Sequence, residues 1–212
     1  MLEKATADQE RLARIRDPGQ TRQALLEAAE REIHLHGYQA ASLSQIINEA
    51  GVTKGALYHH FANKQALGYA VFDEIWAPQL RSMWTEPLHG GQGDPVQVLI
   101  DTIVEAGDSM DDGDLALGCP INNLAQEMSP INEGFRIRIN RLLGEWRDAI
   151  AAGLRRGQAG GFVTRRVRAE TAAAMLVASF EGCLGMAKNA QSRELLVQCG
   201  RGVIDYLETL RT

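Results

Sequence analysis

The sequence has few cysteines and no long apolar run. Its three cysteines, Cys119, Cys183 and Cys199, are an odd number without CxxC or Cys/His spacing. Neither a disulfide framework nor a structural zinc site is therefore expected. No apolar stretch approaches the roughly 20 residues that cross a bilayer, and the polar N-terminus lacks the apolar core of a secretory signal. These absences favour a cytoplasmic protein without a membrane-spanning segment.

Signatures of common enzymes are also missing. The chain contains no glycine-rich phosphate loop, no GxSxG sequence and no HExxH sequence. His34 and His36 are two residues apart on an expected helix, so their imidazoles point about 200° apart around the axis and suit no single metal ion. We therefore expect no catalysis, no metal site and no cofactor.

Charge is unevenly distributed along the chain. The net charge is −5, but residues 11–64 carry seven Lys or Arg against five Asp or Glu, so this part is positive and the remainder is strongly negative. A positive N-terminal part is compatible with nucleic-acid binding. An ordinary solvated helical face would produce the same balance of charges, so charge alone does not distinguish it from a nucleic-acid-binding surface.

The apolar residues recur with the 3.6-residue period of α-helices, and no strand pattern or internal repeat is present. The spacing predicts an all-α protein. Its first helix should begin near residues 18–21 and stop at Gly37, since glycine is favoured just beyond a helix end. Further helices are predicted over about 42–50, 54–61 and 64 to 77–84, and, after a glycine-rich loop, over 95–110, 120–128, 130–157, 168–189 and 193–210.

Residues 42–64 read SLSQIINEAGVTKGALYHHFANK and predict two short helices around a tight turn at Gly51. With the preceding helix they form the plan of a helix-turn-helix, whose second helix enters the major groove of DNA. Leu57 and Phe61, one turn apart, are expected to face the core. A rotation of about 100° per residue then turns Gly55, Ala56 and His59 outward.

The outward face of this second helix suits close contact with DNA. No Asp or Glu occurs between residues 53 and 64, so no carboxylate would meet the phosphates. Gly55 and Ala56 are small enough for the helix backbone to approach the duplex. Lys54 and His59 are the candidates for base contacts, and Thr53 can bind a phosphate. Alternatively, some of the larger side chains here, such as Tyr58 and His60, are partly buried core residues.

This segment resembles the DNA-binding signature of the TetR family, A-G-V-[ST]-x-G-x-[LI]-Y-x-[HY]-F-x-x-K-x-x-L, and the resemblance extends from about Thr21 to Phe72. It implies an all-α homodimer with an N-terminal three-helix helix-turn-helix domain and a C-terminal helical domain for ligand binding and dimerisation. It further implies a repressor that binds palindromic double-stranded operator DNA and leaves it when a small-molecule effector binds. The residues implied to contact DNA are Ser42, Ser44, Thr53, Lys54, Gly55, Tyr58, His59, His60 and Lys64, to which the helix geometry adds Ala56.

The resemblance divides the chain into a flexible arm over residues 1–17, a DNA-binding domain over 18–66 and a ligand-binding and dimerisation domain over 67–212. Basic residues of the arm either reach the minor groove or attract DNA nonspecifically. Pro78 lacks an N–H group, so the helix that begins near residue 64 should bend or end there. Such a bend is a candidate relay between effector and DNA.

The last two predicted helices are candidates for a dimer interface. The 168–189 segment is apolar or small almost all round. The 193–210 segment has a seam with spacings of three and four residues. Either helix alone would equally suit an intrachain core, whereas the family resemblance implies that both join a homodimer. The seam consists of Leu196, Cys199, Val203, Tyr206 and Leu210.

Two hypotheses describe the effector. Cys119 precedes Pro120, so its thiol would lie at a helix N-terminus, where a lowered pKa would let it react with electrophiles; alternatively, this cysteine is a packed core residue. The second hypothesis is a reversible, largely apolar pocket, although most of its aromatic and methionine residues would also suit a plain core. The candidate ligand-binding residues are Trp84, Met110, Cys119, Asn123, Glu127, Phe135, Trp146 and Phe180.

Three further features bear on the C-terminal domain. Residues 118–127 are similar to a G-C-x-x-x-N-L-x-x-E motif of one branch of the TetR family. The acidic segment 108–114 lacks the spacing of a calcium loop and is expected to be a solvated turn. A DNA-binding factor without any small-molecule effector remains the alternative function.

Overall fold

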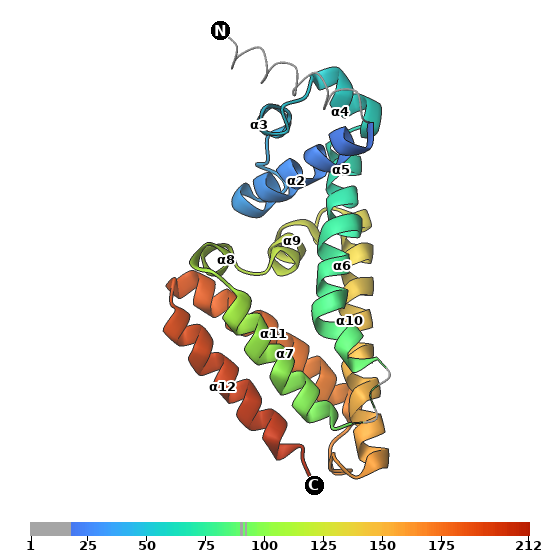
Figure 1. The fold of residues 1–212 in the computed structure, drawn as a ribbon, viewed down its shortest axis with the longest axis vertical. Coiled ribbons are helices and arrows are strands. Elements are labelled where there is room, and N and C mark those ends of the chain that lie inside the picture. The colour runs from blue at the N-terminus through green and yellow to red at the C-terminus, as the bar shows by residue number, and fades with distance from the viewer. Residues whose placement is uncertain (1–17, 90, 92) are drawn as a thin grey trace, which may run out of the picture. The chain divides into compact units, whose positions relative to one another are not determined.

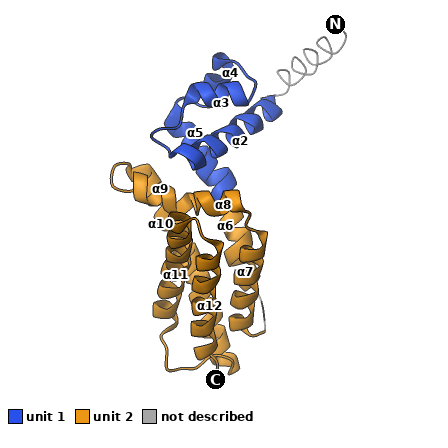
Figure 2. Ribbon diagram, turned by 90° about the vertical axis from the view of Figure 1, so that its left-hand side faces the viewer, with its two compact units in different colours: residues 1–76 blue, residues 77–212 orange. Residues whose placement is uncertain are grey.

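The computed structural model describes residues 18–89, 91 and 93–212. Within these ranges there are helices, turns and loops but no β-strand, only an isolated bridge between Val163 and Arg211. The chain forms two compact units, unit 1 over residues 1–76 and unit 2 over 77–212 (Figure 2). The prediction of an all-α protein is confirmed. The predicted arm over residues 1–17 lies outside the described residues.

The described part of unit 1 is a small helical domain (Figure 1). The first helix, α2, contacts α3, α4 and α5, and α3 contacts α4. Apolar side chains from each helix meet in the core, and Leu25, Ile46, Leu57 and Leu67 are at most 1% exposed. Its elements are α2 (Pro18–His36), α3 (Leu43–Glu49), α4 (Lys54–His60), α5 (Lys64–Val71) and the π-helical η1 (Phe72–Trp76).

Side-chain caps start the short helices close to the predicted boundaries. Ser42, Thr53 and Asn63 each accept a hydrogen bond from the backbone N–H three residues later, over 3.4, 3.2 and 2.8 Å respectively. Gly37 and Gly51 follow helix ends with φ values of 82° and 67°, a region that L-residues with a side chain rarely adopt. The local signals in the sequence therefore determined where these helices begin and end.

The cap of α3 is not a complete capping box. A capping box would let the Gln45 side chain return to the Ser42 N–H, but that N–H instead donates to Glu32 Oε1 over 2.9 Å. Glu32 is 9% exposed and lies on α2. Its carboxylate therefore fastens the start of α3 to α2, which a local sequence pattern could not reveal.

Unit 1 ends at Trp76, and the boundary of the DNA-binding domain at residue 66 stays a prediction. Arg22 of α2 donates two hydrogen bonds to Glu74 of η1, over 2.5 and 2.6 Å. Trp76 is 2% exposed and its Nε1 donates to Glu30 of α2 over 3.2 Å. These contacts attach η1 to α2, and each joins residues more than 45 positions apart in the sequence.

Unit 2 is built around the long helix α10, which contacts α7, α9 and α11, while α12 contacts α7 and α11. Figure 1 shows α7, α11 and α12 side by side. Phe135, Leu142, Trp146 and Ile150 of α10 are at most 2% exposed. Its elements are α6 (Ala77–Leu80), η2 (Arg81–Thr85), η3 (Glu86–Leu88), α7 (Pro95–Ser109), α8 (Asp112–Leu117), α9 (Pro120–Met128), α10 (Glu133–Gly160), α11 (Ala169–Ala190) and α12 (Arg193–Thr209).

Two predictions for this unit are narrowed by the structure. The helical conformation does not end at Pro78, because π-helical segments stand on either side of the short helix α6 that contains it, and a bend there stays a prediction. A wider π turn accommodates a residue that cannot donate the usual α-helical hydrogen bond. The acidic segment is not simply a solvated turn, because Asp111 and Asp114 form a reciprocal capping box that starts α8. Their three-residue spacing was the signal that the sequence prediction missed.

Candidate DNA-binding surface and effector site

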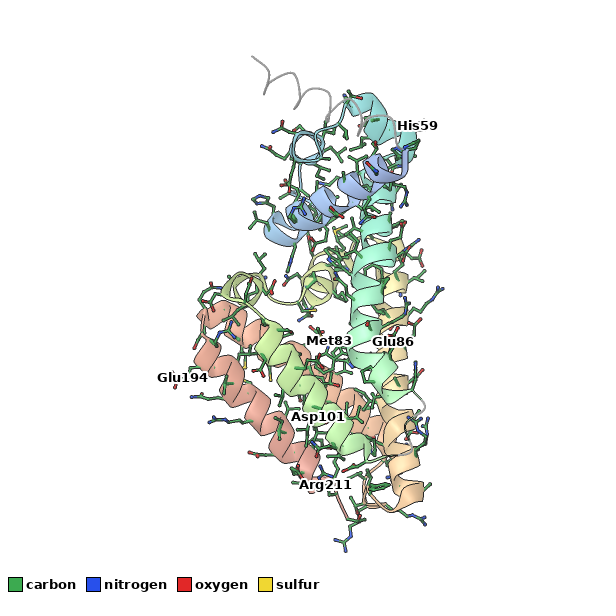
Figure 3. The ribbon with its side chains drawn as sticks, viewed as in Figure 1. His59, Met83, Glu86, Asp101, Glu194 and Arg211 are labelled. Atoms are coloured by element: carbon green, nitrogen blue, oxygen red, sulfur yellow. The ribbon has the colours of Figure 1, made fainter. Side chains whose placement is uncertain are left out.

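The exposed face of α4 is the candidate DNA-binding surface. Thr53, Lys54, Gly55 and His59 are exposed, and Tyr58 is 46% exposed; His59 is marked on α4 in Figure 3. Leu57 and Phe61, at 0% and 4% exposed, face the core as predicted. Ala56 and His60 are half-buried, so they lie at the edge of this face rather than at its crest.

Gly55 leaves open space above the α4 backbone. A Cβ atom built there would meet only Thr53 Oγ1, at 3.8 Å, which is an ordinary van der Waals separation. Within the part of the chain that the structure describes, packing therefore does not require glycine at this position. Glycine weakens a helix by about 1 kcal/mol relative to alanine, so the small residue is better explained by the close approach of something outside the chain.

Most basic residues near this surface are held by other parts of unit 1. Arg22 is paired with Glu74 and lies 5.1 Å from the centre of the Phe61 ring. Arg31 pairs with Glu49 over 2.5 Å. The ammonium group of Lys54, by contrast, lies on the exposed face, 6.0 Å from the centre of the Tyr58 ring. Among the described basic residues of this segment, Arg22 and Arg31 are therefore paired inside the fold, and Lys54 is directed outward.

Lys64 has a structural role that the sequence prediction missed. Its Nζ donates to the carbonyl oxygens of Gln39 and Ala41, over 2.9 and 2.6 Å, and lies 5.1 Å from the centre of the Tyr38 ring. The lysine therefore holds the turn between α2 and α3. A contact between Lys64 and DNA stays a prediction.

The remaining predicted DNA contacts lie at the edge of the candidate surface. The hydroxyls of Ser42 and Ser44 are 2.7 Å apart at the start of α3. Burial lowers the pKa of His60, and the neighbouring charges of His59 and Arg22 lower it further. A neutral imidazole is thereby favoured at His60, which can accept as well as donate a hydrogen bond.

Comparisons with known proteins match both the N-terminal helical unit and the C-terminal helical unit to families of regulatory proteins. The family described as "Bacterial regulatory proteins, tetR family" matches residues 25–71. The family described as "Transcriptional regulator LmrA/YxaF-like, C-terminal domain" matches residues 95–202, about half of the chain. The chain belongs to the TetR family. It is a transcriptional regulator and not an enzyme.

Several TetR-family relatives resemble most of this chain. The HTH-type transcriptional repressor DhaR of Mycobacterium sp. strain GP1 is 28% identical over 84% of this chain and 87% of its own length. The A-factor receptor protein of Streptomyces griseus is 33% identical over 77% of this chain but only 53% of its own length. A TetR transcriptional regulator from Chloroflexus aurantiacus J-10-FL has a similar structure, with a TM-score of 0.79, 25% identity and coverage of 92% of this chain and 97% of that one.

The predicted effector residues of this TetR-family chain do not all meet. Trp84, Trp146 and Phe180 form a three-ring cluster from η2, α10 and α11, with ring centres 4.8 to 5.8 Å apart. Phe135 is 0% exposed in the first turn of α10, and Met110 caps the end of α7, where its carbonyl accepts a hydrogen bond from Arg193. Glu127 is half-buried near the end of α9.

Cys119 is the N-cap of α9, as predicted, but the expected lowering of its pKa is wrong. Its Sγ lies 3.5 Å from the Asn122 N–H and 3.5 Å from Glu181 Oε1. Burial raises the pKa of the Cys119 thiol far above its usual value, and the nearby Glu181 carboxylate raises it further. These effects outweigh the backbone N–H groups of the helix start, so the structure gives no support to a reactive sensor thiol.

The motif at residues 118–127 serves to attach α9 to α11. Asn123 receives a hydrogen bond from Lys188 Nζ over 2.9 Å and donates one to the Leu117 carbonyl over 2.8 Å. Gly118 has a φ of 68°, and a Cβ there would approach Lys188 Cδ to 2.9 Å. Together with the Cys119–Glu181 contact, these residues explain the motif by packing between two helices.

Burial raises the pKa of Glu181 to about 7. A carboxyl whose pKa is higher in the folded state stabilises the fold at low pH, and this contribution is lost as the pH rises through about 7. We therefore expect Glu181→Gln to melt several degrees above the wild type at pH 8, with the difference shrinking toward pH 5. Thermal unfolding followed by circular dichroism tests this; a pH-independent difference would contradict it.

Proposed function

We propose that this TetR-family regulator is a homodimeric repressor that inserts α4 of each subunit into the major groove of a palindromic operator. The observation that carries the proposal is the exposed α4 face, which has no carboxylate and offers Lys54, Tyr58 and His59 around the open Gly55. Lys54 and His59 are placed to read base edges, and Thr53 to bind a phosphate. Contact with chromosomal DNA implies a cytoplasmic location.

Dimerisation is proposed through α11 and α12. One face of α11 is exposed and consists mainly of small and apolar residues, with Met175 and Met186 38% and 55% exposed. Cβ atoms built at Gly182 and Gly185 on this face would meet nothing within 4 Å. A second copy of the chain could therefore pack closely against it, as small residues permit when two helices approach. Part of the apolar seam of α12 packs in the core of its own subunit, since Val203 and Leu210 are already buried there.

The proposed effector is a small molecule that binds within unit 2 and favours a state with lower operator affinity. The match of residues 95–202 to a family of regulatory C-terminal domains supports this assignment. A relative is named "A-factor receptor protein", and a receptor function in that protein is consistent with effector binding by this chain. The effector acts only if it binds one conformational state more tightly than the other.

Replacing Lys54 and Tyr58 together by alanine tests the proposed DNA surface. Each lost phosphate or base contact costs roughly 1–3 kcal/mol, so we expect operator affinity to fall about 100-fold, with less discrimination against unrelated DNA. The assay is fluorescence anisotropy with duplexes from the gene's own upstream region. Arg165→Ala with Arg166→Ala, two exposed residues of unit 2, is the matched control. Undiminished specific binding by the Lys54/Tyr58 variant would refute the proposal.

A further inference from the structure

Two of the three cysteines lie opposite each other in the hairpin of α11 and α12. These helices contact each other (Figure 2), and only Gln191 and Ser192 separate the end of α11 from the start of α12. Cys183 and Cys199 are each eight positions from Gln191 in the sequence. At about 1.5 Å of rise per residue, both lie roughly 12 Å along their helices from the turn. The antiparallel hairpin therefore brings the two cysteines to the same level.

Both thiols are directed into the seam between the two helices. Residues three or four positions apart share one face of a helix, and Phe180 and Ala187, which are the corresponding neighbours of Cys183, are buried. Val203, four positions after Cys199, is buried as well. The thiol of Cys183 makes a hydrogen bond with that of Cys199. Both thiols are free and half-buried, so they meet at a place that a small molecule can reach.

The environment of this pair differs from that of the third cysteine. Cys119 holds its buried thiol against Glu181, whereas Cys183 has a second thiol beside it. Burial and the neighbouring Cys199 raise the pKa of Cys183 to about 11, so its thiolate, the form that reacts with oxidants, is scarce at neutral pH. The pair therefore persists as thiols until a strong oxidant is present. Once one sulfur is oxidised, the other attacks it without diffusion, because the step is intramolecular.

We propose that Cys183 and Cys199 are a modification site, at which a hydroperoxide converts the two thiols into a reversible disulfide within one subunit. A thiolate first attacks the peroxide, the O–O bond breaks, and the thiol proton goes to the departing oxygen, which leaves as water or an alcohol. The second thiol then attacks the resulting sulfenic acid; the S–S bond forms, the S–O bond breaks and water leaves. The two sulfurs lose two electrons in total, which the peroxide gains. The disulfide joins α12 to α11 independently of operator binding.

Peptide mapping of the full chain after treatment with hydrogen peroxide tests this site. Thiols that remain are alkylated with iodoacetamide in denaturant before digestion. Trypsin cleaves after Lys188 and Arg193, so Cys183 and Cys199 fall in different peptides, which a disulfide keeps together. We expect the joined peptides to be the main product, two hydrogen atoms lighter than their two parts, and to separate after treatment with dithiothreitol. Cys119 should be recovered in its alkylated form.

Three variants provide the controls, and circular dichroism checks that each keeps its helix content. Cys119→Ser should give the joined peptides in a yield within twofold of the wild type. Cys183→Ala and Cys199→Ala should leave both remaining thiols open to iodoacetamide. The proposal is wrong if all three cysteines of the treated wild type are alkylated, or if the disulfide includes Cys119. It is also wrong if a non-reducing gel shows that the disulfide joins two subunits.

Discussion

Replacement of Gly55 by leucine is expected to lower operator affinity by about 100-fold or more without unfolding the protein. A Cβ at Gly55 has only one neighbour within 4 Å, Thr53 Oγ1 at 3.8 Å, so the larger side chain extends outward without a clash. In the complex it would hold the α4 backbone away from the groove, and loss of two base contacts at roughly 1–3 kcal/mol each gives this magnitude. Anisotropy titration with the operator duplex measures the effect.

The melting temperature distinguishes this effect from a folding defect. Leucine is a better helix former than glycine by up to about 1 kcal/mol, so Gly55→Leu should melt at or above the wild-type temperature. Gly107→Leu provides the matched control, because a Cβ at Gly107 on α7 meets nothing within 4 Å. It should bind the operator as the wild type does. An unchanged affinity for Gly55→Leu would show that α4 does not approach DNA by this face.

Replacement of Gly182 by arginine is expected to convert the protein to monomers and, as a consequence, to abolish tight operator binding. The position is open in the subunit, so the side chain itself is tolerated. At a close contact between two copies of α11 it would place two like charges and two long side chains in the interface. A monomer has only one DNA-binding domain. It loses the gain in operator affinity that comes from linking two binding domains, which is roughly 10²–10⁴-fold.

Sedimentation velocity measures the oligomeric state of this variant, and circular dichroism measures its helix content. Gly107→Arg, on α7, should remain dimeric and bind DNA normally. If Gly182→Arg still sediments as a dimer and retains operator affinity, α11 does not form the interface that we propose. A dimer that binds DNA poorly would place the defect elsewhere in the chain.

Local sequence signals predicted much of unit 1. The capping residues Ser42, Thr53 and Asn63, together with the glycines after each helix, act within one helical turn, so their effect depends little on the rest of the fold. The inward placement of Leu57 and Phe61 follows from the helical period alone. The same reasoning predicted an outward Gly55, which the structure confirms, and placed Ala56 too far outward.

Contacts between distant residues decided what local signals left open. Glu32 caps α3 from α2, Lys64 holds the turn before α3, and Glu74 extends unit 1 to Trp76. The largest revision concerns Cys119, where the helix N-terminus predicts a lowered pKa. Glu181, 62 positions away, and the surrounding burial raise that pKa instead.

The amino-acid sequence by itself determined that the chain is helical, where α4 starts and which of its residues face outward. These properties depend on neighbours within about four positions in the sequence. Only the tertiary structure decided which charges are available and which polar atoms lack partners. Desolvation and pairing depend on groups brought together from distant helices. Glu181 acquires its unpaired oxygen and its raised pKa in this way, and neither is visible in the order of the residues.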